Sequence, residues 1–255
     1  MDKKLEAFGR LLTIMDELRE QCPWDKKQTM QSLRHLTIEE TYELTDAIFK
    51  DDLPEVKKEL GDVLLHIVFY ARIASETNAF DIADVIHSLC EKLISRHPHI
   101  YGDVKVADEE EVKQNWEKLK LKEGNKSVLG GVPSSLPSVI KALRIQDKAA
   151  QVGFDWPDTQ QVWDKVDEEM AELKETITEQ QELSKTEEEL GDLMFALVNL
   201  SRHLNINPDD ALERTNQKFI QRFQFIEEQC REEGKKITDI NLLEMEQLWQ
   251  LAKTK

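Results

Sequence analysis

Residues 167–197 begin with the segment Asp-Glu-Glu-Met-Ala-Glu and end with Glu-Glu-Glu-Leu-Gly-Asp-Leu-Met-Phe-Ala-Leu. Residues three apart lie on one face of a helix, so Glu169 and Glu172 share a face, and so do Glu189 and Asp192. Carboxylates held this close repel each other, and those beside an apolar run resist the loss of water. The pattern therefore predicts a bound cation, and ligands that are all oxygen favour Mg²⁺ or Mn²⁺ over zinc or iron.

The same pattern occurs once more, earlier in the chain. Residues 39–43 read Glu-Glu-Thr-Tyr-Glu, and residues 59–62 read Glu-Leu-Gly-Asp before a second apolar run. The first segment recurs at an offset of 129 residues (39 to 168) and the second at an offset of 130 (62 to 192). Two further pairs obey the offset of 130: Asp25 with Asp155, and Arg72 with Arg202. A repeat this long indicates two related domains rather than a solenoid.

Composition narrows the class of protein. The chain has 255 residues, a length that suits two domains, and a net charge of −17. Such an acidic chain lacks the basic surface that binds a phosphate backbone, so we expect no nucleic-acid partner. Its three scattered cysteines fit a reducing cytosol and neither a disulfide framework nor a zinc site. No apolar run approaches the ~20 residues that span a bilayer, and the first residues lack a signal peptide, so we expect a cytoplasmic protein without membrane contact.

Apolar residues recur at helical spacing along almost the whole chain. We expect a first helix at 3–20, an acidic helix opened by a Thr37–Glu40 capping box, and its partner through Gly61 to about residue 76. Close approach of the facing helix would explain Gly61. Further helices are expected at 81–95, at 108–121, at 139–150, after the cap Asp158, after a Ser184–Glu187 capping box, at 208–232 and at 241–251. Residues 100–106 carry a weak strand signal.

The stretch 124–137 is rich in Gly, Pro and Ser, which predicts the linker between the domains. We therefore expect an all-α protein of two homologous antiparallel helical bundles in tandem. The N-terminal domain would span 1–123 and the C-terminal domain 138–255.

These motifs resemble a known family. Glu-Glu-x-x-Glu followed by Glu-x-x-Asp on consecutive antiparallel helices is similar to the all-α nucleoside triphosphate pyrophosphohydrolases. The doubled motif, with Cys-Pro-Trp-Asp at 22–25 and Arg-His-Pro-His at 96–99, resembles the MazG family among them, over essentially the whole chain. The resemblance implies MazG-like domains, nucleotide and ATP binding, Mg²⁺ dependence, assembly as a homodimer, and hydrolysis of a nucleoside triphosphate to the monophosphate and diphosphate.

The resemblance also implies roles for matched residues. The implied metal ligands are Glu169, Glu172, Glu189 and Asp192, and the catalytic set adds Lys218 and Arg222. The implied nucleotide-binding residues are Lys165, Glu168, Lys185, Glu188, Asn216, Lys218, Arg222 and Trp249. A second candidate site in the N-terminal half comprises Glu40, Glu43, Glu59, Asp62, Lys92 and Arg96.

Several of these residues also have structural interpretations. Lys218 and Arg222 are four apart on one helix face, which suits a polyphosphate but is also common among surface charges. Trp249 is either a core residue or a platform for a base. Glu168 and Glu188 either support the ligands and activate water or are simply solvated, and both interpretations stay open.

His66 stands within an apolar run, and we expect it to be a hydrogen-bonded core residue rather than a metal ligand. Neither copy contains the Glu-x-x-His of a di-iron site.

We therefore expect a Mg²⁺-dependent pyrophosphohydrolase, broad in base, whose C-terminal domain carries most of the turnover. In the N-terminal half Cys90 replaces Asn216, and Glu55 replaces Lys185, so two donors to the phosphates are missing. Two alternatives stay open. One is a pyrophosphohydrolase specific for a modified nucleotide, and the other is a non-catalytic helical interaction protein.

Overall fold

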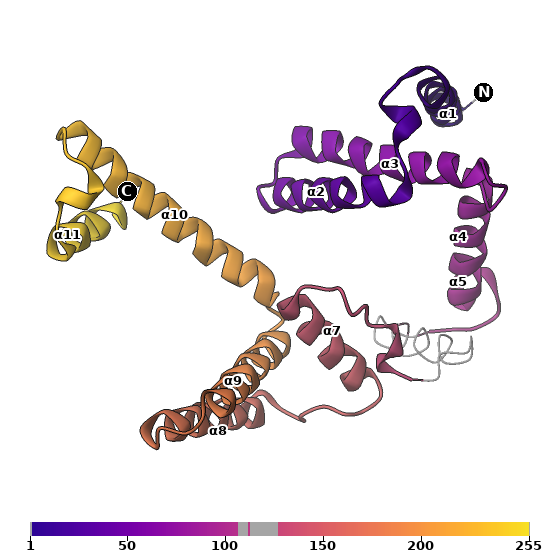
Figure 1. Ribbon diagram of the computed structural model, residues 1–255. Coiled ribbons are helices and arrows are strands. Elements are labelled where there is room, and N and C mark those ends of the chain that lie inside the picture. The colour runs from indigo at the N-terminus through magenta and orange to yellow at the C-terminus, as the bar shows by residue number, and fades with distance from the viewer. Residues whose placement is uncertain (1, 107–111, 113–126, 255) are drawn as a thin grey trace. The chain divides into compact units, whose positions relative to one another are not determined.

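The computed structural model describes residues 2–106, 112 and 127–254, and Figure 1 shows helices and connecting loops throughout these ranges. The chain divides into two compact units, Met1–Val106 and Ala107–Lys255. The all-α prediction is confirmed. The helix expected at 108–121 and the first residues of the expected linker lie outside the described ranges, so the domain bounds stay a prediction. Within the described residues, none of the helices has the length and apolarity needed to cross a membrane.

The first unit is organised around an antiparallel pair of helices. This pair is α2 (Met30–Phe49) and α3 (Leu53–Ser75), and α1 (Lys3–Gln21) packs against α3. The remaining elements are the 3₁₀ turn Asp25–Lys27, α4 (Ile82–Arg96) and α5 (Pro98–Tyr101). The core of the unit contains Met15, Leu33, Val68 and Phe69.

The second unit repeats this plan and extends it. The antiparallel pair is α8 (Thr159–Thr178) and α9 (Leu183–His203), and α7 (Ser138–Gln151) packs against α9 as α1 does against α3. The remaining elements are α10 (Pro208–Glu232), α11 (Leu242–Ala252) and the 3₁₀ turns Leu129–Gly131 and Ile237–Asp239. Val162, Val166, Ala196 and Leu200 form its core, and Leu193 packs against them. Leu193 and Leu200 therefore pack within this unit.

The predicted start of α2 is wrong. The helix begins at Met30, where the Thr29 hydroxyl accepts from the Ser32 N–H and the Ser32 hydroxyl accepts from the Thr29 N–H. Thr37 lies inside the helix, and its hydroxyl oxygen is 2.6 Å from the Tyr70 hydroxyl. Nδ1 of the buried His66 lies 2.9 Å from the Thr37 hydroxyl oxygen, which confirms His66 as a hydrogen-bonded core residue.

Three further local predictions are wrong. Glu182 is the N-cap of α9, without a side-chain cap, so Ser184 lies within the first turn. A Cβ added to the exposed Gly61 would meet no atom within 4 Å, so no facing helix among the described residues explains that glycine. Residues 100–106 form no strand, because Pro98 begins the helical turn α5 and the residues after that turn are irregular.

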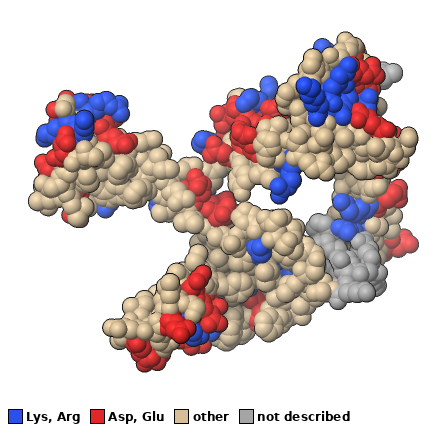
Figure 2. All heavy atoms as spheres, viewed as in Figure 1, with Lys and Arg blue, Asp and Glu red and all other residues tan. Residues whose placement is uncertain are grey.

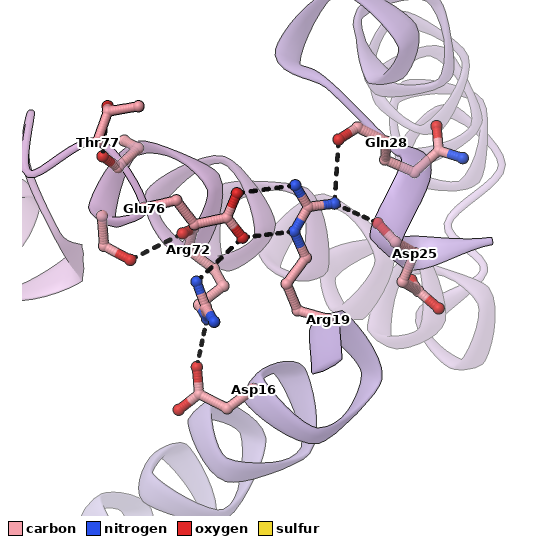
Figure 3. Close-up of polar contacts among 9 residues, drawn as sticks. Asp16, Arg19, Asp25, Gln28, Arg72, Glu76 and Thr77 are labelled. Carbon is pink, nitrogen blue, oxygen red and sulfur yellow. Dashed lines mark hydrogen bonds and ion pairs between the residues drawn. The ribbon is translucent and has the colours of Figure 1, made fainter. Parts of the chain in front are cut away.

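Hydrogen bonds from the Arg19 side chain join the end of α1 to the end of α3, as Figure 3 shows. Its Nε and Nη2 donate to the Glu76 carboxylate at 2.7 and 3.0 Å. Its Nη1 donates to the main-chain carbonyls of Asp25 and Gln28, which lie just beyond α1. Arg72 donates to Glu76 as well, at 3.2 Å. One guanidinium therefore joins three segments of the first unit.

This contact predicts a pH-dependent stability. The hydrogen bonds from Arg19 hold the pKa of Glu76 below its usual value. Since the unfolded pKa is about 4.3, the pair stabilises the fold above that pH, and the stabilisation is lost as the pH falls through the folded pKa. We expect Glu76→Gln to lower the thermal midpoint at pH 7, and the difference from the wild type to shrink toward pH 3, when both are measured by circular dichroism.

Asp46→Asn is the matched control, because Asp46 forms an exposed ion pair with Lys50 on one helix, and such pairs contribute little. A deficit of Glu76→Gln that is equal at pH 7 and pH 3 would contradict the assignment.

Candidate active site

The antiparallel pairing of α8 and α9 brings the two acidic motifs of the second unit together. Glu169 on α8 and Glu189 and Asp192 on α9 each offer a carboxylate oxygen, and these oxygens lie within 4.8 Å of one another. Glu172 is joined to this cluster through Glu169, within a second such group on α8 that includes Glu168. Figure 2 shows acidic side chains gathered over the α8–α9 pair. The structure thus brings the four predicted ligands into one cluster, which we call the α8–α9 quartet.

The quartet combines burial with negative charge. Glu169 and Glu189 are each only 6% exposed. Loss of surrounding water, together with the charges of Glu169 and Glu189, raises the pKa of Glu172. Carboxylates in such a position favour a compensating cation.

Two lysines already pair with the buried glutamates. Lys165 Nζ lies 2.5 Å from Glu169, and Lys185 Nζ lies 2.6 Å from Glu189. Each lysine also pairs with the glutamate that precedes its partner in the sequence, at 2.8 and 3.1 Å. Hydrogen bonds to these glutamates raise the pKa of both lysines. Glu168 and Glu188 therefore lie at the rim of the cluster, where Glu168 forms an ion pair with Lys165 and Glu188 with Lys185.

The first unit contains a related cluster. Carboxylate oxygens of Glu40, Glu59 and Asp62 lie within 4.8 Å of one another. Glu59 is 1% exposed, and its Oε1 accepts from Lys58 at 2.7 Å, whereas its Oε2 is buried without a hydrogen-bond partner. Burial and the neighbouring carboxylates, among them Glu43, raise the pKa of Glu40. The second predicted carboxylate set is therefore also assembled, with Glu43 beside it.

The predicted phosphate-binding cations Lys218 and Arg222 lie on α10, beside Trp249 of α11. The guanidinium carbon of Arg222 lies 5.5 Å from the centre of the Trp249 ring, and the Phe219 ring lies 5.1 Å from that of Trp249. Lys218 and Arg222 line a common hollow beside these rings, and Asn216 donates to a neighbouring glutamate on α10. Among the hydrogen bonds and ion pairs of the described residues, none joins Lys218 or Arg222 to the quartet. Lys92 and Arg96 lie on α4.

The structure also shows a recess that the motifs did not indicate. It has a volume of about 410 Å³ and lies between α7 and α9, with Phe154 and Trp156 on its wall. At its edge Arg202 donates from Nη1 to Asp155 at 2.9 Å, and His203 Nε2 lies 3.1 Å from the same carboxylate. Burial opposes ionisation of Asp155, but these partners hold its pKa below the usual range. The only signal in the sequence was the recurrence of Asp155 and Arg202 at the repeat offset.

Comparison with known proteins extends these observations. A family model described as the MazG nucleotide pyrophosphohydrolase domain matches residues 28–101 and 159–225. A nucleoside triphosphate pyrophosphohydrolase of Escherichia coli (strain K12) is 41% identical over 260 residues, with 98% of each chain covered. The nucleoside triphosphate pyrophosphohydrolase/pyrophosphatase MazG of Thermotoga maritima is 45% identical over 251 residues, which cover 96% of this chain and 95% of the relative.

Among solved structures, a mazG-related protein from Thermotoga maritima is 28% identical, with a TM-score of 0.40, and the match covers 44% of this chain and 98% of that one. The two ranges that match the family model contain both carboxylate clusters, together with Lys218 and Arg222, whereas Trp249 lies beyond them.

Proposed function

The chain belongs to the MazG nucleotide pyrophosphohydrolase family, and from that premise we propose that it hydrolyses nucleoside triphosphates between the α and β phosphates, giving the monophosphate and diphosphate. The observation that carries the proposal is the meeting of two acidic motifs, distant in sequence, in the α8–α9 quartet. Two relatives that match nearly the full chain carry the name of this activity, which supports it. We further propose that many bases are accepted.

We propose that the quartet binds a divalent cation, Mg²⁺ or Mn²⁺. The residues fit such an ion because every donor is a carboxylate oxygen and Glu169 and Glu189 are almost buried. Oxygens of Glu169, Glu189 and Asp192 lie within 4.8 Å of one another, and Glu172 lies as close to Glu169. When bound, the ion would polarise the phosphates and lower the pKa of an attacking water. We propose that Glu168 or Glu188, each paired with a lysine beside the quartet, accepts the proton that this water loses.

The phosphates need cations of their own, because stabilising the charge that develops on them is usually the largest catalytic effect. We propose that Lys218, Arg222 and Asn216 bind the triphosphate together with Lys165 and Lys185, and that Trp249 contacts the nucleotide. Since no described contact joins the α10 group to the quartet, a second copy of the chain is the simplest source of these residues. Exposed apolar side chains on α9 and α10, Leu197 at 43% and Phe219 at 56%, support such a homodimer.

The products of the reaction test the proposed function. With ATP and Mg²⁺ we expect AMP and diphosphate, because attack at the α phosphate breaks the α–β bond. Ion-exchange chromatography separates these products from ADP and orthophosphate. The appearance of ADP and orthophosphate would refute the proposed bond choice, and turnover of a single modified nucleotide in a panel of triphosphates would refute the proposed breadth.

A further inference from the structure

The same five-residue pattern, Lys-x-x-Glu-Glu, occurs on both helices that form the α8–α9 quartet. It reads Lys-Val-Asp-Glu-Glu at 165–169 and Lys-Thr-Glu-Glu-Glu at 185–189. Residues three and four apart share a helix face, so each lysine reaches both glutamates of its own pattern. The matched segments of the first half read Leu-Thr-Ile-Glu-Glu at 36–40 and Glu-Val-Lys-Lys-Glu at 55–59. A lysine at the first position of both segments is therefore a property of the second half.

Each buried glutamate of the quartet has a more exposed lysine as its counter-ion. The side chains of Lys165 and Lys185 are 35% and 48% exposed, whereas those of Glu169 and Glu189 are each 8% exposed. The Nζ–Oε1 distances of 2.5 and 2.6 Å are those of charge-assisted hydrogen bonds. A buried carboxylate without an opposite charge beside it is costly, and the two lysines supply that charge.

The proposed metal ion and the lysines depend on the same carboxylates. Glu169 and Glu189, which pair with the lysines, also belong to the group of oxygens that includes Asp192. Two cations beside one carboxylate repel each other, and the repulsion is strongest where water is scarce. Mg²⁺ also gives up its own water reluctantly, so it competes poorly with an ammonium group that already holds a buried carboxylate. The lysines should therefore weaken the binding of a metal ion that arrives alone.

A triphosphate offers the lysines other partners. The lysine ammonium is a point charge on a flexible four-carbon stem, so it exchanges a carboxylate for a phosphate oxygen without movement of the helix. We propose that Lys165 and Lys185 are exchangeable counter-ions, which pair with Glu169 and Glu189 in the free protein and move to the phosphates when a triphosphate binds. Metal ion and nucleotide then each strengthen the binding of the other. This inference rests on the proposed function and adds a control of the order in which its site is filled.

Two simpler roles for the lysines make different predictions. A lysine that stays on its glutamate as a fixed counter-ion weakens the metal ion equally with and without a nucleotide. A lysine that only binds phosphates leaves the affinity for the metal ion unchanged in both conditions. Exchange alone weakens the metal ion in the free protein and not in the nucleotide complex.

The test measures metal affinity directly in full-length Lys165→Met and Lys185→Met. Free Mn²⁺ is determined from its electron paramagnetic resonance signal, without a nucleotide and with saturating α,β-methylene-ATP, in which a methylene group replaces the bridging oxygen between the α and β phosphates. A titration without protein gives the Mn²⁺ that the analogue itself binds, and this amount is subtracted. Lys174→Met is the matched control, because Lys174 is an exposed lysine of α8 outside the Lys-x-x-Glu-Glu pattern.

Without the analogue, we expect both pattern variants to bind Mn²⁺ at least about tenfold more tightly than the wild type, because a competing cation is gone. With the analogue, the dissociation constants should agree within about threefold, because the lysines have already left the carboxylates. Lys174→Met should match the wild type in both conditions. Equal tightening with and without the analogue would overturn the proposal in favour of fixed counter-ions. Unchanged constants in both conditions would overturn it in favour of lysines that bind phosphates alone.

Lys185→Arg keeps the test decisive if removal of a counter-ion unfolds the protein. An arginine retains the charge on Glu189 and grips a carboxylate with two donors, so the fold should survive. Without the analogue this variant should bind Mn²⁺ no more tightly than the wild type, and the analogue should still strengthen the binding. Tighter binding of Mn²⁺ by Lys185→Arg alone, or loss of the response to the analogue in the wild type, would contradict the exchange.

These measurements need no turnover, which separates the inference from the proposed function. A protein that shows the expected Mn²⁺ constants but releases ADP from ATP would refute the proposed bond choice and leave the exchange standing. A protein that releases AMP and diphosphate but shows equal tightening in both conditions would refute the exchange and leave the function standing.

Discussion

Glu172→Gln is expected to lower turnover at limiting Mg²⁺ by at least about a hundredfold, the size of effect that follows the loss of one contact to the developing charge. Glu172 adds its charge to the quartet from the exposed side of α8. An amide oxygen in its place is a weaker ligand for a hard cation, so less metal is bound and the phosphates are polarised less. The measurement is initial rate against Mg²⁺ concentration at saturating ATP.

The same substitution should not unfold the protein. Loss of surrounding water and the neighbouring carboxylates raise the pKa of Glu172, which means that its negative charge is disfavoured in the fold without a cation. The thermal midpoint of Glu172→Gln without metal should therefore equal or exceed that of the wild type. Glu175→Gln, on the same helix but outside the quartet, is the control and should retain normal rates. A Glu172→Gln enzyme with a near-normal rate at limiting Mg²⁺ would remove Glu172 from the metal site.

The periodic features of the sequence predicted the fold, whereas several local signals did not. The apolar spacing located α1 and α10 within one residue of their observed ends, since burial decides such helices. The Thr37–Glu40 and Ser184–Glu187 patterns matched a capping box but lie inside helices, because Thr and Glu at that spacing are also common within an acidic helix. The Thr37 hydroxyl instead forms a hydrogen bond with the buried His66, a contact between helices that spacing alone cannot indicate.

The candidate site was predictable to the extent that its residues share a helix face or recur in the repeat. Glu169 and Glu189 were predicted from their motifs, and the antiparallel pairing of α8 and α9 brought them together. The recess between α7 and α9 was not predicted, because its walls come from separate segments that only the packing brings together.

The two halves are expected to contribute unequally, with the second carrying most of the turnover. In the full-length chain Glu43→Gln should change turnover less than about twofold, whereas Glu172→Gln, its counterpart at the offset of 129, should nearly abolish it. Both halves assemble carboxylates, so metal binding alone does not distinguish them. The difference lies in the cations available to the phosphates.

In the α8–α9 quartet, Lys165 pairs with the buried Glu169, and Lys185 pairs with the buried Glu189. At the matched positions the first half has Leu36 and Glu55, and Glu55 itself pairs with Lys58, which already serves Glu59. Each donor lost from the transition state slows the reaction roughly a hundredfold. Two such losses would leave the first half with a negligible share of the turnover even if it binds metal. Rates of both variants at saturating ATP and limiting Mg²⁺ decide the matter, because an enzyme silenced by Glu43→Gln and barely slowed by Glu172→Gln would place catalysis in the first half.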